Sequence, residues 1–313
     1  MAHKKTGAPH KKKMVNRKKK QASSRHTDSI TPTLQMGRPG AHSEFDPRAL
    51  ESLQTNIKRL IEEQEFESID EANAFLSQFI GKKDIPKPNR ELTPLEQAQD
   101  KLYEAWDAED EERVKLARAA LAISPDCADA YVLLAEETAE TNEEAMELFQ
   151  KGVEAGERAL GKEFFEECAG EFWDIVETRP YMRARAGLAE AEELRGDPKQ
   201  AAGHYLELLR LNPNDNQGNR YPLARCLLKS GADDELGKLL DQYNDDPMTD
   251  WLYTRALWLF RKDGATERAS AALVKAFIQN PFVPLYMVGI LQMPDEPPDY
   301  DSIEAGGDKE AVE

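Results

Sequence analysis

GLAEAEELRGDPKQAAGHYLELLRLNP, residues 187–213, is the stretch that decides the fold. Apolar residues recur every three or four positions on both sides of Gly196, a pattern that predicts two amphipathic helices joined by a tight turn. Leu188 fits a close-packing position of the first helix, Ala201 is the small residue expected where the helices cross, and Pro213 ends the second helix. Such a helix–turn–helix unit predicts a structural repeat with a period of about 34 residues.

Two further copies of this pattern follow downstream, and two looser copies precede it at about 94–127 and 128–160. The matching positions of the downstream copies are Leu223, Ala224, Gly231, Leu236, Leu240 and Tyr243, then Ala256, Leu257, Gly264, Ala269, Leu273, Ala276 and Pro281. No alternating strand pattern competes with the helical one. The sequence therefore predicts an all-α fold, a tetratricopeptide (TPR)-like right-handed α-solenoid of antiparallel helix pairs.

The composition divides the chain into five segments. We predict a disordered basic arm at 1–43, an N-terminal helical pair at 44–81, a linker at 82–93, a TPR-like helical repeat domain at 94–300 and an acidic tail at 301–313. The arm has almost no large apolar residues with which to offset the entropy of ordering, and the linker contains two prolines. The tail ends in GGDKEAVE, which reads as the start of a further helix and points to a truncated C-terminus.

Two segments lie outside the repeat pattern. The first begins at Pro47 and predicts a helix whose apolar residues are Leu50, Leu53, Ile57, Leu60 and Ile61. The second, 161–180, is rich in aromatic residues. We interpret it as a helical spacer packed between repeats, with a binding insert as the alternative.

Charge is distributed unevenly between the arm and the rest of the chain. Residues 1–43 hold eleven Lys and Arg against one acid, a net charge of +10, whereas the remainder carries 30 basic and 58 acidic residues. The lysines and arginines that we expect to contact a polyanion are Lys4, Lys5, Lys11, Lys12, Lys13, Arg17, Lys18, Lys19 and Lys20. A basic segment of this kind binds RNA or DNA weakly and without sequence preference. A solubilising or targeting tail is the alternative interpretation.

Several classes of function find no support in the sequence. There is no phosphate-binding loop, dinucleotide-binding glycine motif or zinc-protease motif, and four of the five histidines lie in the arm, so we predict no enzyme, no cofactor and no metal site. Asn and Asp residues in NPNDNQG (212–218) are interpreted as ending one helix and capping the next, rather than as calcium ligands. Three scattered cysteines and the lack of a long apolar stretch predict a cytoplasmic protein without a membrane segment.

The first helices of successive repeats line the concave side of such a solenoid, and we predict a partner-binding surface there. The candidate residues are Arg183, Arg225, Trp251, Arg255, Trp258 and Arg261. Guanidinium groups would hold carboxylates of a bound segment and indole rings would hold its apolar side chains. The alternative is that these arginines pair with neighbouring Asp and Glu and that the tryptophans belong to the core.

Some strings are more specific than the generic repeat. TRPYMRARAGLAEA (178–191), NPNDNQG (212–218) and NPFVPLYMVGILQMPDEPPDY (280–300) resemble bacterial TPR proteins related to the suppressor-of-tumorigenicity-7 (ST7) family. The resemblance extends from about Phe66 to Tyr300 and leaves out the basic arm. It implies a repeat scaffold without an assigned reaction.

The function that the sequence favours is a non-catalytic scaffold that binds a protein or peptide in its concave groove. The alternative is a nucleic-acid- or ribosome-associated adaptor that uses the basic arm.

Overall fold

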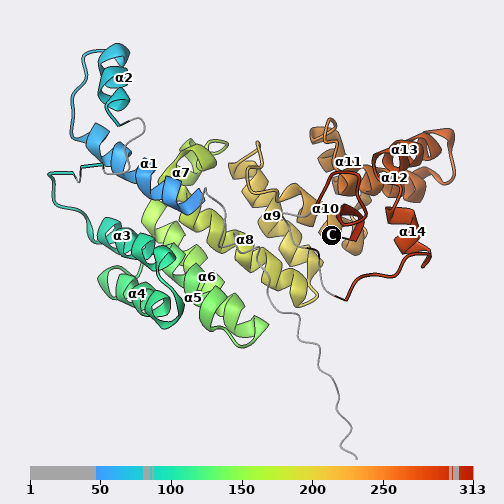
Figure 1. Ribbon diagram of the computed structural model, residues 1–313, viewed down its shortest axis with the longest axis horizontal. Helices are drawn as coiled ribbons and strands as arrows, with labels where there is room; N and C mark the ends of the chain where they lie inside the picture. The colour runs from blue at the N-terminus through green and yellow to red at the C-terminus, as the bar shows by residue number, and fades with distance from the viewer. Residues whose placement is uncertain (1–46, 80–84, 87, 296–297, 299–302, 313) are drawn as a thin grey trace, which may run out of the picture. The chain divides into compact units, whose positions relative to one another are not determined.

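The structure is a computed structural model of the chain, and every regular element in the part that it describes is helical (Figure 1). The described residues are 47–79, 85–86, 88–295, 298 and 303–312. The basic arm, with all of its candidate lysines and arginines, lies outside these ranges. The all-α, TPR-like class of fold predicted from the sequence is confirmed.

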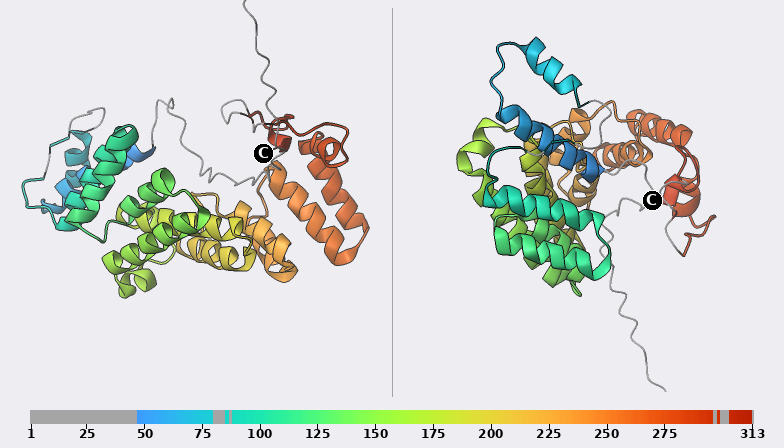
Figure 2. Two further views of the ribbon diagram at one scale, coloured as in Figure 1. Left: turned by 90° about the horizontal axis from the view of Figure 1, so that it is seen from below. Right: turned by 60° about the vertical axis from the view of Figure 1, so that its left-hand side comes forward.

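Five antiparallel helix pairs form the body of the described chain (Figure 2). In chain order the pairs are α3 (Pro94–Asp107) with α4 (Asp110–Ile123), α5 (Ala128–Thr138) with α6 (Asn142–Leu160), α8 (Arg179–Leu194) with α9 (Pro198–Leu211), α10 (Arg220–Ser230) with α11 (Asp233–Gln242), and α12 (Thr249–Asp263) with α13 (Glu267–Gln279). Each pair packs against the next, so the pairs form a continuous stack.

The remaining elements flank or interrupt the pairs. They are α1 (Pro47–Glu62), α2 (Ile69–Ser77), α7 (Lys162–Glu167), the short 3-10 helices η1 (Phe172–Asp174) and η2 (Val176–Thr178), α14 (Val283–Met287) and the 3-10 helix η4 (Glu310–Val312). Both α1 and α2 lie within the predicted segment 44–81.

Local sequence signals account for where the helices begin and end. Thr93 and Glu96 form a reciprocal capping box at the start of α3, in which each side chain accepts a hydrogen bond from the other residue's backbone N–H. Gly231 ends α10 in the left-handed conformation, with φ of 72°, which glycine adopts without a steric penalty. Asp215 accepts hydrogen bonds from the backbone N–H groups of Asn219 and Arg220, as expected for a residue that caps the next helix.

Small residues allow helices to approach closely, both within a pair and between neighbouring pairs. Ala201 is fully buried, and at Gly187 a Cβ atom would lie 2.3 Å from the ring of Phe149. The helix positions predicted for the third and fourth pairs are buried, namely Leu188, Ala201, Leu223, Ala224, Leu236 and Leu240, whereas Leu257 and Leu273 of the last pair remain about half exposed. In the described part of the chain no further helix pair covers α13, so its outer face stays in contact with solvent.

The aromatic segment 161–180 packs between the second and third pairs. Phe172 is fully buried, and the rings of Phe165 and Tyr181 meet edge to face with centroids 4.8 Å apart. These contacts join the segment to the main hydrophobic core. The interpretation of this segment as a packed spacer is confirmed.

The N-terminal helix α1 lies alongside α3 and reaches η2 at the start of α8 (Figure 1). Its apolar residues recur at helical spacing, but among them only Leu60 is fully buried, and Leu50 is exposed. The face that α1 buries is instead mainly polar and consists of Glu51, Thr55 and Arg59, which follow one another at intervals of four residues.

Candidate protein-interaction surface

The first helices of the pairs lie next to one another, α3 beside α5, α5 beside α8 and α10 beside α12. We call their shared solvent-side face the inner surface. It has two portions. The covered portion, under α1, consists of Gln99, Tyr103, Asp129, Arg179 and Arg183, and the open portion consists of Glu136, Glu190, Glu193, Arg225, Lys229 and Asp250.

Arg183 is at the centre of the covered portion and is fully occupied by contacts within the chain. Its guanidinium donates to Asp129 over 2.6 and 2.7 Å and to Glu51 of α1 over 2.8 and 3.0 Å. Asp129 is fully buried and Glu51 is nearly so. The guanidinium also lies over the ring of Trp106, 5.2 Å from its centroid. Arg183 therefore links α1, α5 and α8, and four of its hydrogen bonds go to carboxylates of the chain itself.

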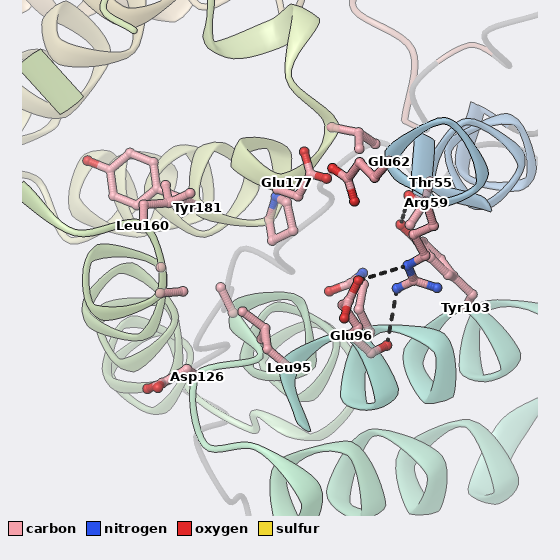
Figure 3. Close-up of a pocket in the computed structure, with 16 residues that line it drawn as sticks. Thr55, Arg59, Glu62, Leu95, Glu96, Tyr103, Asp126, Leu160, Glu177 and Tyr181 are labelled. Carbon is pink, nitrogen blue, oxygen red and sulfur yellow. Dashed lines mark hydrogen bonds and ion pairs between the residues drawn. The ribbon is translucent and has the colours of Figure 1, made fainter. Parts of the chain in front are cut away.

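Two further polar contacts hold α1 in place, and the residues of the first, Thr55 and Tyr103, are labelled in Figure 3. The hydroxyls of Thr55 and Tyr103 are 2.9 Å apart, and Arg59 donates to Asp100 over 2.6 Å. A cavity of about 200 Å³ remains beside these contacts, between α1, α3 and the start of α8. The side chains of α1 thus satisfy the polar groups beneath them without filling the space.

The open portion carries a different arrangement, in which two cations share one carboxylate. Arg225 donates to Glu193 over 2.7 and 2.9 Å, and Lys229 donates to the same carboxylate over 2.8 Å. Burial raises the pKa of Glu193, but the hydrogen bonds from Arg225 and Lys229 outweigh it and lower the pKa to about 2. Both cations are more than half exposed and remain accessible to a partner.

Glu190 lies one helical turn before Glu193 and has no hydrogen-bond donor among the residues that the structure describes. Burial raises its pKa, Arg225 lowers it in part, and the neighbouring carboxylates of Glu193 and Glu136 raise it further. A half-buried carboxylate in this setting is stabilised by a cation that comes from outside the chain. Counted together, the open portion holds four acidic and two basic side chains, so it favours a basic partner.

The two candidate tryptophans are not on the inner surface, and the prediction that they lie there is wrong. Trp251 is fully buried, donates from its indole N–H to the carbonyl of Tyr243 over 2.8 Å and meets the ring of Tyr221 edge to face. Trp258 is 4% exposed and donates to the carbonyl of Asp233 over 2.7 Å. Both indoles donate to carbonyls of α11 or of the residue that ends it, and Gly237 of α11 leaves room for the ring of Trp258.

The last two candidate arginines also bind within the chain. Arg255 donates to the carbonyl of Leu240, and Arg261 donates to the carbonyl of Leu228 over 3.0 Å and lies 3.1 Å from Asp233. These carbonyls and the carboxylate belong to the last turn of α10 and to α11. Of the six residues proposed from the sequence, only Arg225 is both on the inner surface and accessible.

The residues that sequence reasoning missed are the acidic partners of these arginines. Glu51, Asp129 and Glu193 lie 132, 54 and 32 residues from the arginines that they bind, so no local pattern connects them. One signal was present. The polar residues of α1 at 51, 55 and 59 share one helix face, which is as regular as its apolar face.

No arrangement suited to catalysis or metal binding emerges within the described ranges. No group of three metal-ligating side chains is found there. Burial raises the pKa of the Cys127 and Cys226 thiols to about 12, which leaves both protonated. No helix in the described chain is long and apolar enough to cross a membrane. The cytoplasmic location remains a prediction.

Comparison with known proteins finds one family and two curated proteins that are similar to part of the chain. Residues 91–171 match the family described as ST7 protein. Two nematode proteins named Protein ST7 homolog are similar over 232 residues, at 30% identity in Caenorhabditis elegans and 29% in Caenorhabditis briggsae. The chain is therefore similar to the ST7 proteins over part of its length. The ST7-related match covers 60% of the chain and 42% of each nematode protein.

A solved structure has a related helical arrangement. It is YrrB, described as a TPR protein with an unusual peptide-binding site, with a TM-score of 0.43, 20% sequence identity and coverage of 69% of this chain and 97% of YrrB. Both nematode relatives of the ST7-related chain are eukaryotic, so the expected likeness to bacterial members in particular stays a prediction.

Proposed function

We propose that this chain is a non-catalytic scaffold that binds a segment of another protein along the open portion of its inner surface. The bound segment carries a Lys or Arg side chain that pairs with Glu190. A carboxylate of the same segment pairs with Arg225 and Lys229, which lie across from Glu190 on the neighbouring helix α10. Stacked helix pairs commonly hold extended or helical segments in this way.

One observation carries the proposal: Glu190 is a half-buried carboxylate whose pKa is raised and which lacks a hydrogen-bond donor within the described chain. Buried acidic groups in a folded chain are ordinarily paired, as Asp129 and Glu51 are here. An incoming cation would stabilise the charged form of Glu190 and would gain a partly desolvated ion pair. This gain is larger than that of an exposed pair.

The proposal differs from the sequence-based prediction in the charge of the bound side chain. All four candidate arginines bind acceptors of the chain itself, and among them only Arg225 is more than half exposed, so the accessible surface is not a groove of free arginines. The remaining basic pair, Arg225 and Lys229, already shares Glu193. A mixed segment with a cation and an anion about one helical turn apart therefore suits the open portion better than an acidic tail.

Selection from a library of displayed peptides tests this proposal. We expect the full chain to enrich peptides that contain Lys or Arg, and Glu190→Gln to weaken the best of them at least tenfold. Arg255→Ala is the matched control, since Arg255 lies on the side of α12 that faces α11, and it should leave affinity unchanged. Retention of full affinity by both Glu190→Gln and Arg225→Ala would exclude the open portion as the site.

The nucleic-acid adaptor remains a separate hypothesis that rests on the +10 charge of residues 1–43. A filter-binding assay with RNA, comparing the full chain with one that lacks residues 1–43 at two salt concentrations, measures it directly. Loss of a salt-dependent affinity on deletion would support the adaptor. Unchanged RNA binding would exclude a role for the arm.

A further inference from the structure

The contact between α1 and the covered portion differs from an ordinary core contact. Helices of a solenoid bury apolar faces against their neighbours, as α8 and α9 do with Leu188 and Leu208. Helix α1 buries Glu51, Thr55 and Arg59 and leaves much of its apolar face near solvent. A polar interface of this kind resembles those between proteins that associate reversibly.

The covered portion is complementary to this polar face along two helical turns. At one end the carboxylate of Glu51 pairs with the guanidinium groups of Arg183 and Arg179, with closest N···O distances of 2.8 and 3.6 Å. At the other end Asp100 and Glu96 accept the guanidinium of Arg59, over 2.6 and 3.3 Å. The cationic end and the anionic end of the surface are separated by Tyr103, which contacts Thr55. The surface thus distinguishes the direction in which a helix lies on it.

The covered portion also keeps its form without α1. Arg183 retains Asp129 when Glu51 leaves, Gln99 donates to Asp129 over 3.0 Å, and Glu96 retains Arg90. Arg183, Asp129 and Glu96 therefore each keep a partner, and Asp100, which loses Arg59, is about one-third exposed, so departure of α1 does not leave an isolated, fully buried charge. Residues 63–93 connect α1 to α3, and this length of chain lets α1 move off the surface while the pairs stay folded.

We propose that the covered portion is a second binding site, for a helix of a partner protein, and that α1 is its built-in competitor. This inference rests on the proposed function, that of a scaffold for other proteins, and extends it to a separate surface. The partner helix presents a carboxylate and a guanidinium eight residues apart on one face, with a small hydroxyl residue midway. A bulkier helix that also fills the cavity of about 200 Å³ displaces α1 more readily.

A peptide with the sequence of residues 47–65, labelled with fluorescein, serves as the probe, and fluorescence anisotropy measures its affinity for full-length chains. In the wild type the tethered α1 competes at an effective concentration in the millimolar range. The double variant Glu51→Gln with Arg59→Gln weakens the contact of the tethered α1 with the covered portion and leaves that surface unchanged. We therefore expect it to bind the peptide at least tenfold more tightly than the wild type does. The control Glu65→Gln changes an exposed carboxylate beyond the end of α1 and should behave as the wild type.

The peptide itself provides the reciprocal control. A peptide carrying the same two substitutions should bind the double variant at least tenfold more weakly than the natural peptide. Equal affinity of the natural peptide for the wild type and the double variant would overturn the proposal. Arg225→Ala should leave the affinity for this peptide unchanged. A failure of the proposed second site is therefore distinguishable from a failure of the proposed site on the open portion.

Hydrogen exchange of the wild type gives a second measurement that does not depend on a variant folding. We expect the amides of α1 to exchange at least tenfold faster than those of α5 and α8, because α1 opens without the pairs. Exchange of α1 at the same rate as α5 and α8 would show that it is a fixed part of the fold and would overturn the proposal. Sedimentation that reveals a dimer, abolished in the double variant, would assign the surface to α1 of a second copy and overturn the choice of a partner protein.

Discussion

The two portions of the inner surface are built on equivalent helices but differ in what satisfies their charges. In the covered portion, Arg183 binds two carboxylates that are almost completely buried, one of them supplied by α1. In the open portion, Arg225 is 54% exposed and shares Glu193 with Lys229. Arginines on the first helices α8 and α10 thus have different roles. The difference shows that an inner-surface arginine indicates a partner site only after acceptors within the chain have been identified.

The largest expected effect comes from removing the cation that organises the covered portion. Arg183→Ala leaves Asp129 and Glu51 buried without their main partner, and we expect a loss of about 3–5 kcal/mol in the free energy of unfolding. Urea denaturation followed by circular dichroism measures this loss. A cost below about 1 kcal/mol, typical of exposed ion pairs, would show that the two portions do not differ in this respect.

Substitutions at the helix crossings of two pairs test whether both crossings are equally close. Ala201→Leu places a large side chain where α8 and α9 cross, and overpacking should lower the free energy of unfolding by about 1–3 kcal/mol. Ala269→Leu is the matched change in the last pair, where the outer face of α13 is exposed and relaxation is easier. Thermal melting compares the two variants. Tolerance of leucine at residue 201 would contradict the close crossing.

The next comparison separates an accessible arginine from a structural one. Arg255→Ala removes the donor to the carbonyl of Leu240, and we expect it to cost about 1–3 kcal/mol of stability. Arg225→Ala leaves Glu193 with Lys229 and should cost about 1 kcal/mol or less. In thermal melting we expect Arg255→Ala to be the more damaging variant. In peptide binding we expect Arg225→Ala to be the more damaging one. The same ranking in both assays would place Arg225 among the structural arginines.

The smallest expected effect concerns Glu190 and depends on pH. Because its pKa is raised in the folded state, protonation favours folding, and this contribution is lost as pH rises through the folded pKa. Glu190→Gln removes the titration, so the variant should melt slightly above the wild type at neutral pH. The difference should vanish when the pH falls below the ordinary glutamate pKa. A variant that melts lower at neutral pH would show that Glu190 already has a favourable partner.

Sequence reasoning identified the helix pairs, their turns and the packed aromatic segment. Close crossings require small residues such as Ala201, and turns require glycines such as Gly231. These residue types therefore occur at fixed positions within a repeat, where the sequence shows them. The candidate site was harder to predict. Trp251 and Arg255 fall on first helices as expected, but the rotation of α12 directs them toward α11. A rotation of this kind is set by packing between pairs, which a single sequence does not reveal.

The sequence by itself determined the helical periodicity, the repeat register and the opposed charges of the arm and the body, because these depend on residues close together in the chain. Only the tertiary structure decided that α1 covers one portion of the inner surface and that its polar face is the buried one. That outcome depends on Glu51, Asp129 and Arg183, which are far apart in the chain and meet only after the pairs have stacked. Long-range ion pairs produce no periodic pattern in a sequence, whereas packing within a helix pair produces apolar residues at helical spacing.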